Sequence, residues 1–151
     1  MLNLPLDTER FIPEITDENR QKADEKYKKL GINPDKTIIL IQDSVMFDYR
    51  VLKPEFWVKL AQELKSKGYD VIFNAKKDFK GFKSTFLNIM DFVEFAKKAK
   101  HIISFRSGIN DLFAAMNIDN MSVIYPYNME VIWADKFFFD NLLNKYHEKL
   151  F

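Results

Sequence analysis

The chain has 151 residues, of which 47% are hydrophobic and 30% charged, and its formal net charge is +1. This balance is typical of one soluble globular domain, and it excludes an extended basic surface for nucleic acid. The four glycines form no GxGxxG or GxxxxGKS pattern, and the lack of cysteine excludes disulfides and thiolate zinc sites. No apolar run reaches the ~20 residues of a membrane span, so we expect a cytoplasmic protein.

The first 35 residues are predicted to form an extended lead-in and a charged linker helix. The helix is expected over Asp17–Leu30, with Asp17 as its N-cap and Gly31 as its stop. Ala23, Tyr27 and Leu30 form only a thin apolar stripe on this helix. We therefore expect the helix to lie on the surface, as a connector to another domain.

A continuous apolar run, KTIILIQ at 36–42, follows the linker helix. Such a run is typical of a parallel strand that is buried on both faces. Pro54 can open the next helix, which carries Trp57 on its apolar face and stops at Gly68. The basic segment KKDFKGFKS after the second strand is expected to be a solvated loop, and Asp91 is expected to cap a later helix.

The remaining strands are predicted at 69–75, 85–89, 101–105 and 121–125. Because strands and helices alternate, the pattern predicts a doubly wound α/β domain, with a mainly parallel sheet of about five strands and helices on both faces. We expect a single domain over 1–151, with its core at 36–126 and a long aromatic C-terminal helix at 127–151.

The stretch HIISFRSGINDLFAAM, residues 101–116, is predicted to be a strand, a tight turn and a helix that opens at about Ile109. A helix N-terminus carries unpaired N–H groups, so the turn Arg106-Ser107-Gly108 can hold a phosphate. Gly108 would let a ligand approach the backbone, and Arg106 could neutralise a diphosphate. The alternative is an ordinary turn, in which Ser107 and Asp111 cap the helix and Arg106 forms a surface ion pair.

Other polar residues follow strand ends, where ligands bind in open parallel sheets. If the strand order is 3-2-1-4-5, Asp43 and Ser44 after the first strand face the Arg106 turn across the point where the order reverses. Asn74 ends the second strand, and its position alone is weak evidence. The two histidines lie apart without clustered acids, which argues against a metal site.

These residues resemble a known family. The runs IILIQDS, LKPEFWVKLAQELKSKGYDVIFNA, FVEFAKKAKHIISFRSGINDLFAAM and VIYP resemble the C-terminal, donor-binding half of GT-B type bacterial surface-polysaccharide glycosyltransferases, including the heptosyltransferase-like group. That group usually has an Asp-Ser-Gly turn followed by a helix containing His. Here Arg106 stands at the Asp position and Asp111 at the His position. The resemblance covers about residues 36–126.

The resemblance implies a Rossmann-like domain that binds a nucleotide-diphosphate sugar for polysaccharide or lipopolysaccharide synthesis. Ser107 and Gly108 would then hold the donor diphosphate with help from Arg106, and Tyr125 would close the nucleotide side with Pro126. It implies no cofactor beyond this substrate and no metal. It also implies that an N-terminal acceptor domain or a second chain is missing. Without that part, we expect the chain to bind the donor but not to transfer a hexosyl group. We expect such an enzyme to be located in the cytoplasm, at the inner face of the membrane.

Two alternatives remain at the sequence level. The chain can be a non-catalytic α/β interaction module, whose C-terminal helix binds a partner or forms a homo-oligomer through Trp133 or Phe137. A flavodoxin-like or response-regulator-like domain is disfavoured, because the first strand lacks paired acids.

Overall fold

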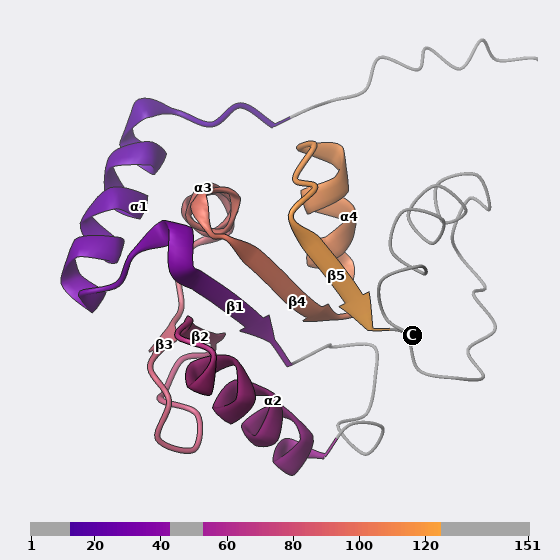
Figure 1. Ribbon diagram of the computed structural model, residues 1–151. Coiled ribbons are helices and arrows are strands. Elements are labelled where there is room, and N and C mark those ends of the chain that lie inside the picture. Colours follow the sequence, from indigo (N-terminus) through magenta and orange to yellow (C-terminus); the bar gives the residue numbers. More distant parts are fainter. Residues whose placement is uncertain (1–12, 43–52, 125–151) are drawn as a thin grey trace, which may run out of the picture.

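The computed structural model describes residues 13–42 and 53–124 (Figure 1). Five strands form one parallel sheet in the order β3-β2-β1-β4-β5, which confirms the predicted fold class and strand order. The strands are β1 (Thr37–Ile41), β2 (Asp70–Asn74), β3 (Ser84–Thr85), β4 (His101–Phe105) and β5 (Met121–Ile124). The order reverses between β1 and β4, which lie side by side.

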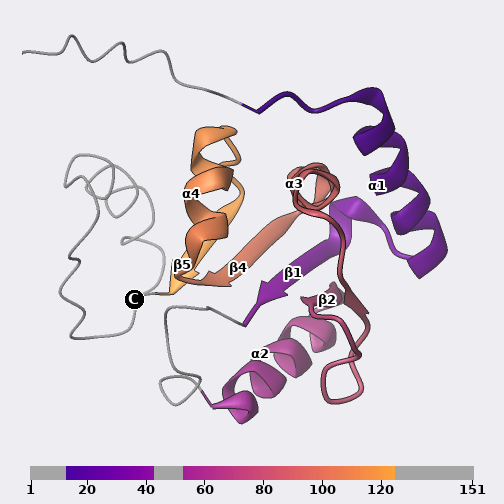
Figure 2. The same ribbon diagram turned by 180° about the vertical axis from the view of Figure 1, so that it is seen from behind.

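Four helices cover the sheet in the described part of the chain. They are α1 (Asp17–Leu30), α2 (Pro54–Ser66), α3 (Ile89–Lys98) and α4 (Gly108–Ala115), with a short 3₁₀ turn at Pro34–Lys36. In Figures 1 and 2, α3 and α4 lie on one side of the sheet, α1 lies outside α3, and α2 lies on the opposite side below β1 and β2. The described chain is therefore a three-layered α/β domain.

Strand side chains alternate between two separate cores, as expected for strands buried on both faces. Ile39, Ile72 and Ile102 point to the side of α3 and α4 and pack in one cluster with Phe95 and Phe113. The second cluster lies under α2. It contains Ile38, Leu40, Val71 and Phe73 from the sheet with Trp57 and Ala61 from the helix. Both clusters bury their central residues almost completely.

Two predicted helix caps are wrong by a few residues. Thr16, rather than Asp17, is the N-cap of α1, and its hydroxyl accepts a hydrogen bond from the Asn19 N–H at 3.3 Å. Asn88, rather than Asp91, caps α3, because its Oδ1 accepts from the Asp91 N–H at 3.0 Å. A cap side chain must lie before the first helical turn, and Asp91 lies within it. Gly31 ends α1 at φ +62°, as predicted.

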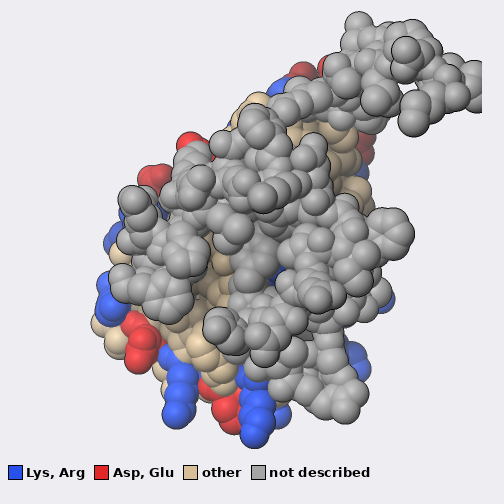
Figure 3. Space-filling view, turned by 90° about the vertical axis from the view of Figure 1, so that its right-hand side faces the viewer, with Lys and Arg blue, Asp and Glu red and all other residues tan. Residues whose placement is uncertain are grey.

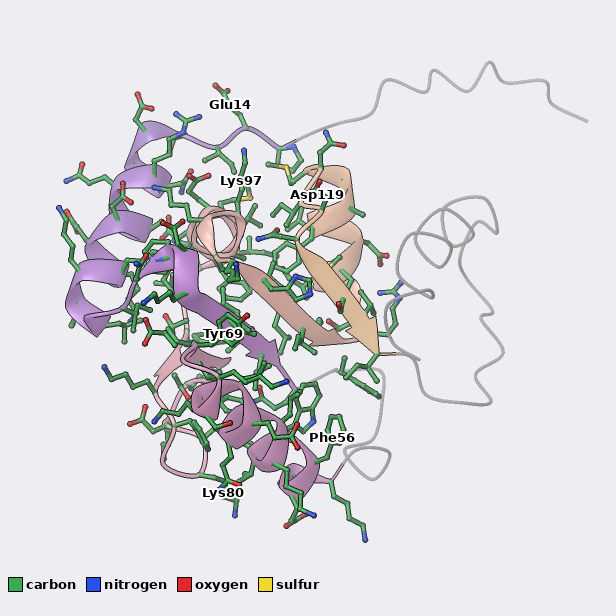
Figure 4. All side chains as sticks on the ribbon, viewed as in Figure 1. Glu14, Phe56, Tyr69, Lys80, Lys97 and Asp119 are labelled. Carbon is green, nitrogen blue, oxygen red and sulfur yellow. The ribbon has the colours of Figure 1, made fainter. Side chains whose placement is uncertain are left out.

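The third strand and the basic loop before it also differ from the prediction. Strand β3 is only Ser84–Thr85, and Ile89 already begins α3. Within the loop, Phe79 and Phe82 pair as a two-residue hairpin, with Lys80 and Gly81 at positive φ. The Phe79 ring stacks on buried Phe73 at 4.5 Å, so this loop is anchored rather than fully solvated. Lys80 lies at its tip (Figure 4).

Helix α1 packs against α3 through a partly polar interface. Its apolar stripe is as thin as predicted, with Ala23 and Tyr27 buried. The Tyr27 ring stacks on Phe95 at 4.2 Å and its hydroxyl donates to the Phe95 carbonyl at 2.9 Å, and burial raises the pKa of this phenol. Lys98 pairs with Asp24 at 2.7 Å. Aromatic packing and a buried hydrogen bond therefore attach α1 firmly to the domain.

Asp91 is the buried polar centre of this interface. Its side chain is 5% exposed and accepts from Asn19 Nδ2 at 2.7 Å and from Asn88. Lys22 lies 4.0 Å away, and a hydrogen bond to Glu18 together with the charge of Asp91 raises the pKa of Lys22. A buried carboxylate needs such partners, so Asp91 orders the start of both helices.

Among the described helices, none is long and apolar enough to cross a bilayer. Several predictions concern residues outside the described ranges: Asp43, Ser44, Tyr125, Pro126 and the C-terminal helix. They stay predictions.

Candidate functional site

The turn Arg106-Ser107-Gly108 joins β4 to α4 at the carboxyl edge of the sheet. Strand β4 is the neighbour of β1, so the turn lies beside the point where the strand order reverses. Open parallel sheets bind ligands at this place, because the strand ends there leave a crevice between loops. The position that the sequence predicted for the turn is therefore confirmed.

Ser107 precedes α4 in an extended conformation, with φ −155° and ψ 170°. Its backbone N–H donates to Asn110 Oδ1 at 2.7 Å, and its hydroxyl lies 3.4 Å from the same oxygen. The Asn110 N–H in turn donates to the Ser107 carbonyl at 3.0 Å. Ser107 is thus the N-cap of α4 and forms a capping box with Asn110, in which the Asn110 side chain makes the shorter contact.

Asn110 is a site residue that sequence reasoning missed. It is 2% exposed, and its Nδ2 lies 3.3 Å from Met121 Sδ on β5. One amide side chain therefore joins the turn, the first turn of α4 and the neighbouring strand. The signal was available, since an Asn three residues after a capping Ser can accept from the backbone of the cap.

Gly108 begins α4 and offers open space. A β-carbon placed there would meet no atom within 4 Å, and its φ is not in the left-handed region. The fold itself therefore does not require glycine at this position. Because Gly108 is exposed and lacks a side chain, its backbone is accessible, and an alanine there tests this without a clash inside the protein.

Arg106 forms an ion pair with Asp111 in the first turn of α4. Arg106 Nη2 donates to Asp111 Oδ1 at 2.9 Å and to Oδ2 at 3.0 Å, and Nη1 donates to the Ser107 carbonyl. The Arg106 side chain is 16% exposed and that of Asp111 is 51% exposed. This pair is the contact expected of an ordinary turn. Solvent weakens the pair at its half-exposed Asp111 end, whereas the largely buried Arg106 is also held by the Ser107 carbonyl.

The other predicted residues do not all join this turn. Asn74 ends β2 and is half-buried, and β1 lies between its strand and β4. Asp111 lies next to Arg106, with which it forms the ion pair. His101 is half-buried on β4, where its Nε2 is hydrogen-bonded to Ser122 Oγ at 2.8 Å. Residues 13–42 and 53–124 contain no cluster of three His, Cys, Asp or Glu that could hold a metal.

An open depression of about 880 Å³ lies at the opposite, amino edge of the sheet. It is lined by the ends of α1 and α2 at Gly31 and Gly68, and by Asn33 and Asp70 before and at the start of strands. The Asp70 carboxylate already accepts from the Asn33 N–H at 3.1 Å. Since it lies at the other ends of the strands, this depression is no part of the candidate site.

The charge on the described surface is mixed. In Figure 3, basic and acidic side chains lie next to one another along the visible described part, without a patch of one sign. This agrees with the net charge of +1. The face in Figure 3 thus adds no field of one sign to the local positive groups at Arg106 and the start of α4.

No protein-family model matches the chain, and no curated protein matches it. A search of solved structures finds similarity to the crystal structure of the glycosyl transferase family 9 from Veillonella parvula DSM 2008. The two superpose with a TM-score of 0.61 at 15% sequence identity, over 77% of this chain and 38% of that one. At this identity the similarity is one of fold. The matched part of this chain covers less than half the length of that protein. The described sheet and helices share the fold of the part that matches.

Proposed function

We propose that this chain is the donor-binding domain of a glycosyltransferase, and that a nucleotide-diphosphate sugar binds at Arg106-Ser107-Gly108. One observation carries the proposal: the turn opens a helix at the carboxyl end of β4, beside the reversal of strand order. The fold similarity to a glycosyl transferase family 9 structure supports the reaction class. The heptosyltransferase-like pattern of the sequence supports the same class.

The chemistry of the turn suits a diphosphate. The start of α4 provides backbone N–H groups and the positive end of the helix dipole. The open space at Gly108 allows an oxygen to approach that backbone. Arg106 would exchange its pair with half-exposed Asp111 for the more highly charged diphosphate. In this proposal these groups neutralise the diphosphate without a metal.

Transfer of the sugar needs an acceptor-binding part, which we propose is supplied by an N-terminal domain or a second chain. The family 9 structure has a large part that this chain does not cover. The described chain alone would then bind the donor without turnover. Completed, the enzyme would transfer a hexosyl or related group in polysaccharide or lipopolysaccharide synthesis, in the cytoplasm at the inner face of the membrane.

Thermal unfolding against UDP-, GDP-, ADP- and CMP-linked sugars tests the proposal. A ligand at 100 times its dissociation constant adds ~2.7 kcal/mol of stability. For a chain of this length this raises the Tm by about 5–11 °C. We expect such a shift with one nucleotide class, and its loss in Arg106→Ala and in Gly108→Ala, whose added methyl group clashes with a bound oxygen but with no atom of the protein.

Arg20→Ala is the matched control, because Arg20 also pairs with an exposed aspartate, Asp17, but on α1. Its ligand-induced shift should equal that of the wild type. If no nucleotide sugar shifts the Tm, or if the shift survives in both Arg106→Ala and Gly108→Ala, the proposal is wrong. The remaining reading would then be a non-catalytic interaction module.

A further inference from the structure

One half of the sheet face on the α2 side has no described helix over it. Helix α2 contacts β1 and β2, and its buried residues Trp57 and Ala61 pack on those strands. In both Figures 1 and 2, no described helix lies on that side of β4 and β5, whereas α3 and α4 cover the other side. A parallel sheet of a doubly wound fold is normally covered on both faces.

The side chains on this uncovered half-face are set by strand alternation. Ile102 of β4 and Met121 and Val123 of β5 belong to the core beneath α3 and α4. Their alternates Ile103 and Ile124 therefore point to the α2 side, where they pack against the α2 cluster and are only partly buried. An apolar surface formed by strands at the end of a sheet is a place for another element to pack.

The half-face is apolar at one end and polar at the other. Ile124 and Phe105 lie at the carboxyl ends of β5 and β4. His101, at the amino end of β4, is hydrogen-bonded to Ser122 at 2.8 Å on the same face. An element that covers this half-face should thus be apolar where it lies near Ile124 and polar about one strand length away.

We propose that the C-terminal segment of this chain, residues 128–151, covers this half-face as a helix that runs from Ile124 back toward His101. The segment leaves β5 at the carboxyl edge, so a helix that returns over the sheet begins at the apolar end. Met129, Ile132, Trp133 and Phe137 recur at helical spacing in its first part.

The length and the pattern of the segment fit the strands. Five strand residues span about 16 Å, which equals about 11 residues of helix. Counting from Met129, the helix passes the amino end of β4 at about Asp140, which stands in line with Trp133 on the helix and ends its apolar stripe. In this arrangement the polar side chain of Asp140 would lie near His101 and Ser122, at the polar end of the half-face.

The absence of cysteine makes thiol labelling a direct test in the full chain. Three Ser→Cys variants, nearly isosteric with the wild type, report on three environments. Ser122→Cys lies on the half-face, Ser104→Cys is fully buried on β4 toward α3 and α4, and Ser66→Cys is exposed at the end of α2. We expect the thiol at position 122 to react at least about tenfold more slowly than the thiol at position 66, because a covered thiol reacts only after local opening.

Trp133→Asp places a charge in the contact and should raise the reaction rate of the thiol at 122 to nearly that of the thiol at 66. The thiol at 104 should stay protected, which shows that the domain is still folded. Asp135→Ala is the matched control, since Asp135 lies on the opposite side of the same predicted helix and its loss should change neither rate. If Trp133→Asp also exposes position 104, Trp133→Ala and Phe137→Ala repeat the test with milder changes.

Three results would overturn the proposal. The thiol at 122 could react as fast as the thiol at 66 in the otherwise wild-type chain. Its protection could survive every change at Trp133 and Phe137, which would assign the cover to another element. Its protection could also fall on hundredfold dilution, which would assign the cover to a second copy of the chain. None of these results depends on nucleotide binding, so the proposed function is tested separately.

Discussion

Replacing Asn110 by alanine should show that a buried amide, rather than the Ser107 hydroxyl, maintains the turn before α4. In the wild type, Asn110 Oδ1 accepts the Ser107 N–H at 2.7 Å, and its Nδ2 contacts Met121 Sδ. The alanine variant loses the acceptor and leaves a partly buried N–H without its partner. This costs about 1–3 kcal/mol, with a further contribution from the cavity that the 2%-exposed side chain leaves.

Urea unfolding measures this difference directly, and thermal unfolding should show a decrease in Tm of about 2–12 °C for a chain of this length. Ser107→Ala is the matched comparison. It keeps the backbone N–H and removes only the longer, hydroxyl side of the capping box, so it should cost about 0.5 kcal/mol, at the low end for an N-cap serine. Equal losses in the two variants, or a larger loss in Ser107→Ala, would refute this account of the turn.

Three further predictions concern the rest of the domain. Asp91→Ala should lower the free energy of unfolding in urea by about 1–3 kcal/mol, because the Asn19 amide loses its acceptor at 2.7 Å. A decrease below about 0.5 kcal/mol would contradict the role of Asp91. Gly81→Ala should cost about 1 kcal/mol, since alanine is strained at φ +86°; an unchanged urea midpoint would exclude this turn geometry. Tyr27→Phe should cost about 1 kcal/mol at neutral pH, because the hydroxyl donates to the Phe95 carbonyl. Burial raises the pKa of Tyr27, so the stability this phenol provides is complete below pH ~10 and is lost as the pH rises above it. The variant should accordingly lose less stability than the wild type between neutral and alkaline pH, and parallel urea-midpoint curves would contradict this.

Most of the sheet could be predicted because the sequence patterns of its longer strands allow only one interpretation. Strand β1 is a continuous apolar run that admits no polar face, and β4 is followed at once by the turn that opens α4. Where the signals compete, the prediction was wrong. Asp91 looks like a cap by residue type, yet Asn88 lies at the required position and Asp91 serves the contact with α1 instead.

The candidate site could be predicted in position but not in its contacts. The residues Arg106 to Gly108 follow a strand and precede a helix, and this alone locates them at the carboxyl edge. Sequence spacing could not decide whether Arg106 pairs with a bound anion or with Asp111, because that depends on side-chain geometry. The structure shows the pair with Asp111. The spacing of Asn110 from Ser107 was a usable signal that was overlooked, whereas its contact with Met121 on β5 could not be predicted from the local sequence.

The shortness of β3 bears on how this protein avoids unwanted sheet growth. Only Ser84 and Thr85 pair with β2 at this end of the sheet, and the hairpin at 79–82 adds a separate bridge beside them. Exposed edges recruit strands of other molecules when they are long, flat and apolar, whereas short edges flanked by lysines do not. Lys76, Lys77 and Lys80 flank this edge. The loop that precedes β3 thereby disfavours intermolecular strand pairing at this edge.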